Sequence, residues 1–402
     1  MIGIRARGAI GAAALLLSAG CGQAAPATSA SATTARPPGS APSQRPTPGS
    51  LASPSTSSSA GLEVERLPTD GAPAALTTDG TRIVWSLADA SGANPGIYRW
   101  QPGGSVELVY RSPNPRANMQ SLAASGDHIT FCEASTEEVG WISWTFWYLA
   151  RPGAQPVKLA TDRRPVDQPG LVPQPALNRD RLVYAIQRFD KGVLMSELVL
   201  IDLGTMKRRV LASTPFDTTE YWYPSLDGSR LVYGTVEYSK DGRTDDRHVY
   251  LRDLDRPTDR PRRLDSDGTA ADPVIRGGTV VWKDAPRAFN MNNWGELEAY
   301  SLADGSIRKL DFASASEGQS HNFPSLGNRF VAADLWDATS LTIYDLATRT
   351  EVAVERYEPT SGHALMRPVI AGDLLVWVSA PDFTGAGGEI HYAQLPPAIA
   401  SP

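Results

Sequence analysis

The feature that most constrains this chain is a short run of strand-forming residues that recurs seven times between residues 62 and 402. Each copy contains two β-branched or aliphatic residues and usually ends in an aromatic, and successive copies lie 45 to 53 residues apart. The copies are Ile83-Val84-Trp85, Ile129-Thr130-Phe131, Leu182-Val183-Tyr184, Leu231-Val232-Tyr233, Val280-Val281-Trp282, Phe330-Val331-Ala332 and Leu375-Val376-Trp377. A period of this length indicates a repeat architecture and not two or three unrelated domains.

Each repeat unit contains four short strand patterns. A glycine turn precedes most copies of the run, and a strand that begins near a proline precedes the turn, as at Pro224 and Pro273. A third and a fourth strand follow, as in residues 341–348 and 351–354. Four short strands in units of roughly 40–50 residues predict a β-propeller.

The two ends of the repeat region predict how the ring closes. The seventh unit contains three strands, whereas residues 62–67 form a lone strand pattern before the first unit. We therefore expect the N-terminal strand to complete the last blade, which removes an open sheet edge. The predicted fold class is all-β: a seven-bladed β-propeller of four-stranded blades over residues 62–402.

The glycine-turn, strand and aromatic pattern resembles a known repeat. Together with third strands such as Ile343-Tyr344-Asp345-Leu346, it is similar to the TolB-type, WD-like propeller repeats of bacterial envelope proteins, over nearly all of residues 62–397. The Ser-Pro-Asp-Gly turn of that family has its nearest counterpart in Ser225-Leu226-Asp227-Gly228. The resemblance implies a periplasmic or surface scaffold that binds partners. It transfers no catalytic residue, because one fold hosts many functions.

Residues 1–21 have the layout of a secretory signal. Arg5 and Arg7 precede an apolar stretch, residues 9–17, that is too short to span a bilayer. The sequence Leu17-Ser18-Ala19-Gly20-Cys21 resembles the lipobox of bacterial lipoproteins, in which the cysteine becomes the lipidated N-terminus. The resemblance implies a membrane anchor at Cys21 on the outer side of the cytoplasmic membrane, in the cell envelope. The alternative is a secreted protein with a chance cysteine at this place.

Residues 22–61 have the composition of a linker. Ser, Ala, Pro, Thr and Gly supply 35 of these 40 residues, and the only large apolar side chain is that of Leu51. Such a segment cannot bury enough apolar surface to offset the entropy lost on ordering. We expect a disordered spacer between the signal and the propeller.

Charge and cysteine content exclude two classes of protein. The formal net charge is −6, which argues against a nucleic-acid-binding protein, since that would need a basic face. The chain has 2 cysteines, too few for a disulfide scaffold. Cys132 lies in a strand flanked by neighbouring blades, so we expect a buried, unreactive thiol.

The loops before the first strand of each unit and between its second and third strands share one face of a propeller. These loops are long and rich in aromatic and polar residues, and binding tends to occur on loops that a rigid scaffold holds. We predict this loop-rich face to be the binding surface; the alternative is that its aromatics pack between blades. The candidate binding residues are Trp141, Glu220, Trp222, Asn293, Trp294, His321, His363 and Arg367.

Three acids occupy equivalent places near strand ends. Glu133, Asp284 and Asp334 allow glycoside hydrolysis, which needs two carboxylates, or calcium ligation, but the sequence demands neither. His321 and His363 precede consecutive blades without a metal-binding spacing such as HExxH, so we expect no metal site.

The functional prediction follows from these observations. We expect a membrane-anchored, non-catalytic scaffold that binds an envelope protein or a glycan through its loop-rich face. The alternative is a carbohydrate-active enzyme, a glycoside hydrolase or lyase, with carboxylates at the channel mouth. No cofactor is expected, with a structural calcium ion as the open alternative.

Overall fold

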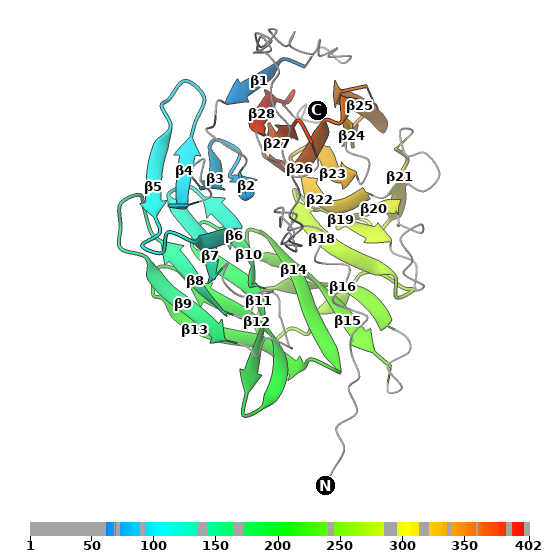
Figure 1. The fold of residues 1–402 in the computed structure, drawn as a ribbon. Coiled ribbons are helices and arrows are strands. Elements are labelled where there is room, and N and C mark those ends of the chain that lie inside the picture. The colour runs from blue at the N-terminus through cyan, green and yellow to red at the C-terminus, as the bar shows by residue number, and fades with distance from the viewer. Residues whose placement is uncertain are drawn as a thin grey trace, which may run out of the picture. The chain divides into compact units, whose positions relative to one another are not determined.

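Nearly all the regular structure of the described residues is strand. The computed structural model describes residues 62–67, 69, 73–88, 93–135, 143–163, 172–239, 245–284, 296–312, 321–335, 339–358, 361–382 and 388–397. Within these residues 28 strands form seven four-stranded antiparallel sheets (Figure 1). The predicted seven-bladed propeller is confirmed.

The first three blades each use four consecutive strands, ordered from the innermost strand outward. Blade 1 comprises β2 (Ala75–Thr78), β3 (Ile83–Leu87), β4 (Gly96–Trp100) and β5 (Glu107–Arg111). Blade 2 comprises β6 (Ala117–Ser125), β7 (His128–Ser135), β8 (Ser143–Leu149) and β9 (Val157–Arg163). Blade 3 comprises β10 (Gln174–Asn178), β11 (Arg181–Asp190), β12 (Val193–Asp202) and β13 (Lys207–Pro215).

The next three blades repeat the same order. Blade 4 comprises β14 (Thr219–Asp227), β15 (Arg230–Tyr238), β16 (Asp245–Asp253) and β17 (Arg262–Arg263). Blade 5 comprises β18 (Ala270–Arg276), β19 (Thr279–Asp284), β20 (Glu296–Ser301) and β21 (Ile307–Leu310). Blade 6 comprises β22 (His321–Leu326), β23 (Phe330–Leu335), β24 (Ser340–Asp345) and β25 (Thr350–Arg356).

Blade 7 combines strands from both ends of the propeller. It consists of β26 (Ala364–Ala371), β27 (Leu374–Ala380), β28 (Glu389–Gln394) and, outermost, β1 (Val64–Leu67). β1 pairs antiparallel with β28, from Val64 opposite Ala393 to Leu67 opposite Ile390. Leu67 is buried, and the Tyr392 hydroxyl donates a hydrogen bond to the Glu65 carboxylate. The predicted closure by the N-terminal strand is confirmed, and Figure 1 shows β1 beside β28.

The innermost strands surround a central axis. β2 contacts β6, and the contacts continue through β10, β14, β18, β22 and β26 back to β2. Each blade therefore meets two neighbours, and both faces of its central strands are covered. This arrangement explains why the recurring run is apolar at consecutive positions and not only at alternate ones. Its aromatic residues are buried, among them Trp85, Tyr184, Trp282 and Trp377.

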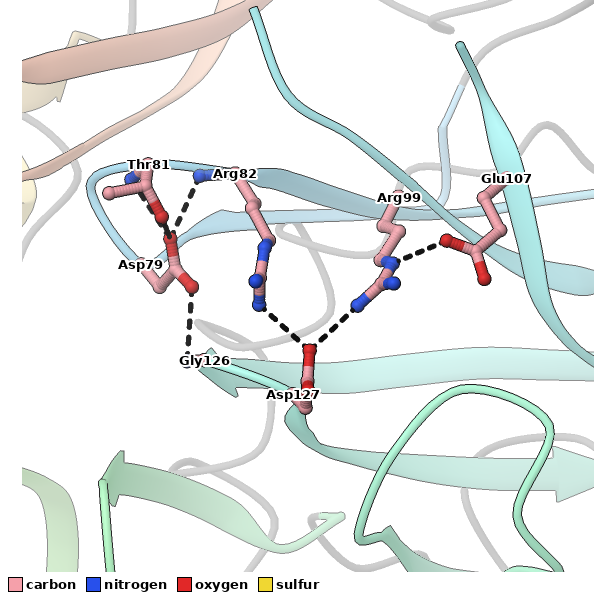
Figure 2. A network of polar contacts seen from close by, with 7 residues as sticks. All are labelled: Asp79, Thr81, Arg82, Arg99, Glu107, Gly126 and Asp127. Carbon is pink, nitrogen blue, oxygen red and sulfur yellow. Dashed lines mark hydrogen bonds and ion pairs between the residues drawn. The ribbon is translucent and has the colours of Figure 1, made fainter. Parts of the chain in front are cut away.

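The turns between the first and second strands fasten neighbouring blades. In blade 1, Asp79 Oδ1 caps its own turn by accepting from Thr81 N at 2.9 Å and Arg82 N at 2.8 Å. Its other oxygen accepts from Gly126 N of blade 2 at 3.0 Å (Figure 2). Asp227 makes the same link to Gly277 N of blade 5, also at 3.0 Å. One carboxylate thus shapes a turn and joins two blades.

Glycine is required where these turns approach most closely. A Cβ on Gly327 would lie 2.5 Å from Gly372 O, and one on Gly80 would lie 2.8 Å from Ala371 O. Both distances are below any real Cβ contact, so a larger residue would push the blades apart. These two contacts lie at the junctions of blade 7 with blades 6 and 1.

Candidate functional site

Five innermost strands contain a β-bulge at the same place. The ladder between first and second strands shifts register there, for example between Trp222 and Ser225 of β14. One non-glycine residue at each bulge has a positive φ, between 42° and 55°. We call these the bulge residues: Ser121, Tyr223, Asp272, Phe323 and Arg367.

The bulges explain why these segments were predicted to be loops. Four bulge residues precede a proline, which donates no hydrogen bond to a ladder. The strand nevertheless continues on the N-terminal side of the proline, so Glu220, Trp222 and Arg367 lie in first strands and not in loops.

Holding an L-residue in the left-handed region costs roughly 1–2 kcal/mol, whereas glycine adopts it without this steric cost. The chain places five different larger side chains at these equivalent positions and glycine at none of them. A purely structural bulge would be satisfied by glycine. Strain of this kind, kept at equivalent positions, typically marks a functional surface.

Four of the five bulge residues line a cavity on the axis of the ring. This axial cavity has a volume of about 460 Å³ and is bounded by β2, β6, β10, β14, β18 and β22. Ser121, Tyr223, Asp272 and Phe323 face it. The fifth, Arg367, donates from Nη1 to the backbone oxygens of Pro73, at 3.0 Å, and Ala74, which ties blade 7 to the start of blade 1.

Two of the bulge residues that line the axial cavity are aromatic and contact each other. The rings of Tyr223 in blade 4 and Phe323 in blade 6 pack edge to face with centroids 5.6 Å apart. Gln174 Oε1 of blade 3 accepts from Tyr223 N at 2.8 Å, and burial raises the pKa of the Tyr223 hydroxyl well above its usual value. Phe323 is 39% exposed, which makes it one of the large apolar side chains of the described residues that solvent reaches.

Asp272 of blade 5 is the acidic bulge residue. Burial raises its pKa, and the positive charges of Lys283 and Arg247 oppose that rise. Lys283 is itself buried, which lowers its pKa, while Asp272 favours its charged form. Asp272 therefore lies in a mixed group of charges that offset one another.

Glu220 lies near this group, at the start of β14. Its side chain is buried, and its carboxyl accepts from the Tyr238 hydroxyl and from Gln187 Nε2 at 3.4 Å. Burial raises the pKa of Glu220 to about 7, against the opposing effects of Tyr238, Trp222 and Arg247. A carboxyl with this pKa changes charge near neutral pH and can give or take a proton there.

The structure places the predicted site residues in three groups. Arg367 is itself a bulge residue, Trp222 lies beside Tyr223 with ring centroids 5.8 Å apart, and Glu220 lies three residues before Tyr223 in β14. His363 directly precedes β26, the strand that contains Arg367. The remaining candidates fall outside what the structure describes: Trp141, Asn293, Trp294 and Cys21, together with the side chain of His321.

His363 adjoins a buried network between blades 6 and 7. Its ring stacks on Tyr357 with centroids 4.3 Å apart, and the Tyr357 hydroxyl donates to Glu355 at 3.0 Å. Glu355 also accepts from Trp377 Nε1 at 2.7 Å and contacts His391 Nδ1 at 3.0 Å. Burial would raise the pKa of Glu355, but these partners outweigh it and lower the pKa. Glu355, Tyr357, Trp377 and His391 are buried, so the network joins blades 6 and 7.

Glu133 and Cys132 of blade 2 both take part in packing within and between the blades. Glu133 accepts from Trp147 Nε1 at 3.0 Å and from the Ser112 hydroxyl, which joins blades 2 and 1. Cys132 is fully buried, and burial raises its pKa well above the usual value. Neither residue faces the axial cavity.

A second hollow, of about 550 Å³, lies at the turns of blade 1. Arg82 and Arg99 line it, and Asp127 Oδ1 accepts from both guanidinium groups at 3.0 Å (Figure 2). Arg99 also donates to Glu107 at 2.7 Å. The cationic groups are thus already paired with carboxylates.

Neither a metal-ion cluster nor a membrane-spanning helix occurs in the described residues. No group of three or more His, Cys, Asp or Glu side chains there is placed to hold a metal ion. Likewise, no helix in that part of the chain has the length and apolar character needed to cross a membrane.

The residues that sequence reasoning missed are Ser121, Tyr223, Asp272 and Phe323. In three of the four, the signal is a large or acidic residue before a proline at the same point of successive repeats, as in Tyr223-Pro224 and Asp272-Pro273. The prolines were interpreted as strand starts, and the residues before them as the ends of loops.

Comparison with known proteins supports the β-propeller fold and assigns no activity to it. No protein family matches the sequence, and no curated protein matches it either. The β-propeller domain of the Trilobed protease from Pyrococcus furiosus superposes with a TM-score of 0.54 at 12% identity, over 85% of this chain and 99% of that chain. An oligogalacturonate lyase in complex with manganese gives 0.50 at 14% identity, over 85% of this chain and 96% of that chain.

TolB from Acinetobacter baumannii is also among the structural neighbours. Its TM-score is 0.41 at 14% identity, over 79% of this chain and 77% of that chain. At these identities the likenesses to the protease domain and to the lyase show the β-propeller fold alone. The Trilobed protease domain has an open velcro topology, whereas β1 closes the ring of this chain.

Proposed function

We propose that this protein is a non-catalytic binding scaffold whose ligand, a protein or a glycan, contacts the axial cavity and the loop-rich face beside it. The observation that carries the proposal is the set of five non-glycine bulge residues, four of which face one cavity. Strained side chains from several blades converge there, as is typical of recognition sites on rigid scaffolds.

The lining of the axial cavity favours binding over glycoside hydrolysis. Among the lining residues that the structure describes, Asp272 is the one carboxylate. Hydrolysis of a glycosidic bond ordinarily needs two carboxylates on either side of that bond. A scaffold needs none.

The second candidate function is a carbohydrate-active enzyme, and one observation favours it. Glu220 has a pKa of about 7, which suits a general acid or base, and it lies two residues before Trp222 on the strand that carries Tyr223. Its burial beneath Tyr238 and Gln187 argues against direct contact with a substrate.

A capture experiment tests the scaffold. The purified full chain and a Tyr223→Gly/Phe323→Gly variant are used to capture partners from an extract of the source cell's envelope. Glycine keeps the left-handed backbone and removes only the side chains. Met206→Gly is the matched control, because Met206 also has a positive φ and an exposed apolar side chain but lies in the β12–β13 turn.

We expect the double variant to lose partners that the wild type and Met206→Gly retain. Equal capture by all three proteins would overturn the assignment of the axial cavity. Turnover of a glycan substrate that Glu220→Gln abolishes would favour the enzyme.

We further propose that the scaffold is anchored by a lipid on Cys21 to the outer side of the cytoplasmic membrane. The support is the order of positive, apolar and small residues in 1–21 and the linker composition of 22–61. Two or three acyl chains would hold the protein durably, since each buried methylene contributes about 0.8 kcal/mol. Cys21→Ala should move the protein from the membrane fraction to the soluble fraction, and unchanged retention would exclude this anchor.

A further inference from the structure

We infer that the axial cavity binds a neutral saccharide of one or two rings, stacked on Phe323 and hydrogen-bonded by Asp272 and Gln174. This inference rests on the proposed binding function and narrows its ligand to one chemical class. Four properties of the cavity lead to it: its size, its exposed aromatic ring, its polar groups and its balance of charge.

The size suits a small ligand. A volume of about 460 Å³ lies in the lower half of the roughly 300–1,000 Å³ that small-molecule sites occupy. First strands of six blades line the cavity, so a ligand bound there would contact rigid backbone. A folded protein partner would contact the rim instead of filling this volume.

Phe323 supplies an apolar platform inside the cavity. It is 39% exposed, whereas Pro324 and Leu326 of the same strand are buried, and its backbone has a φ of 46°. Tyr223 supports it edge to face from two blades away, which fixes the orientation of the ring. Covering apolar surface is favourable, so a ligand with an apolar face gains by stacking here.

Polar groups lie next to this platform. Asp272 occupies the bulge between the two aromatic residues in blade order, and Gln174 and Ser121 line the cavity from blades 3 and 2. A carboxyl accepts strong hydrogen bonds from hydroxyl groups, and an amide both donates and accepts. A ring with an apolar C–H face and hydroxyl groups at its edge matches both halves of this lining.

The charges argue for a neutral ligand. Asp272 is the charged side chain among the described residues that line the cavity, the positive charges of Lys283 and Arg247 act on it, and Arg247 is itself ion-paired with Asp245 at 2.9 Å. Because these opposite charges offset one another, the cavity offers no net attraction to a cation or to an anion. The hydroxyl groups of a neutral sugar bind without adding net charge.

The test is calorimetric titration and saturation-transfer NMR of the full chain with cellobiose, maltose and N,N′-diacetylchitobiose. Digalacturonate is the anionic comparison, and glucosamine is the cationic one. We expect saturable binding of at least one neutral disaccharide. Phe323→Gly and Asp272→Gly should weaken it by about tenfold or more, whereas Met206→Gly should not.

Three results would overturn the inference: no saturable binding of any neutral disaccharide, equal binding by Phe323→Gly, or equal binding of the charged sugars. The capture experiment separates this failure from failure of the scaffold itself. If Tyr223→Gly/Phe323→Gly loses a captured protein while no saccharide binds, the binding function stands and the saccharide is wrong.

Discussion

Replacing Glu220 with glutamine should change how stability depends on pH. Glu220 is buried, with a pKa of about 7 in the folded protein against 4.5 for the ordinary carboxyl. Between these two pH values the unfolded chain loses the proton and the folded chain keeps it, so the unfolding free energy falls as pH rises. Well above pH 7 both the folded and the unfolded chain have lost this proton, so the contribution of Glu220 to the unfolding free energy no longer changes with pH.

The size of the pKa shift of Glu220 sets the size of the change in unfolding free energy. One pKa unit corresponds to 1.36 kcal/mol, so Glu220 should contribute a loss of about 3 kcal/mol between pH 4.5 and pH 8. Glutamine has no charge at any of these pH values and retains an oxygen that accepts from Tyr238. The Glu220→Gln variant should therefore gain stability relative to the wild type as pH rises, by up to about 3 kcal/mol.

The measurement is urea unfolding of both proteins at pH 4.5, 5.5, 6.5 and 8, followed by tryptophan fluorescence and extrapolated linearly to water. Other groups that titrate in both proteins cancel in the difference. Glu237→Gln serves as the control for the carboxyl-to-amide change, because Glu237 lies on the neighbouring strand β15 and is partly exposed. Parallel curves for wild type and Glu220→Gln would refute the assigned burial of a neutral carboxyl.

Other predictions concern ring closure and the buried thiol. Leu67→Ala should lower the unfolding free energy by about 2–5 kcal/mol in the same urea assay, because Leu67 is buried where β1 completes blade 7; an effect below 0.5 kcal/mol would contradict that role. Arg367→Ala should cost about 1–3 kcal/mol by removing its hydrogen bonds to Pro73 O and Ala74 O, and unaltered stability would mean that they do not join the blades. In a Cys21→Ala background, Cys132 should react with a thiol reagent only as the protein unfolds in urea, because it is fully buried with a raised pKa; rapid labelling of the native protein would contradict this.

The fold could be predicted because its signals are local. Spacing of the strand patterns, the apolar runs that end in Trp85 or Trp377, and the glycine turns each depend on a few neighbouring residues. The closure followed from counting, since a blade with three strands at one end requires the lone strand at the other. The linker and the anchor at Cys21 remain predictions.

The site could not be predicted to the same extent, because a bulge is a property of two paired strands. The backbone of Tyr223 is left-handed because the register of β14 shifts there: Trp222 pairs with Gly234, whereas Ser225 pairs with Val232. No sequence pattern predicts that shift. A residue before proline is typical of an extended or turning segment, so the sequence favoured loops. Glu220 was expected on an exposed loop and lies buried in a strand, whereas Trp222 and Arg367 do adjoin the bulges.

The pairing of β1 with β28 has a mechanical consequence. The chain N-terminal to residue 62 joins the propeller through β1, so a force transmitted along that segment acts first on the ladder between Val64 and Leu67 and its partners in β28. The other six sheets are each built from consecutive strands, whereas this ladder joins strands far apart in the chain. Tension along the strand would load its hydrogen bonds together, and tension across it would open them one at a time from Val64. The closing strand is thus also the point at which a pull on the N-terminal segment would begin to unravel the ring.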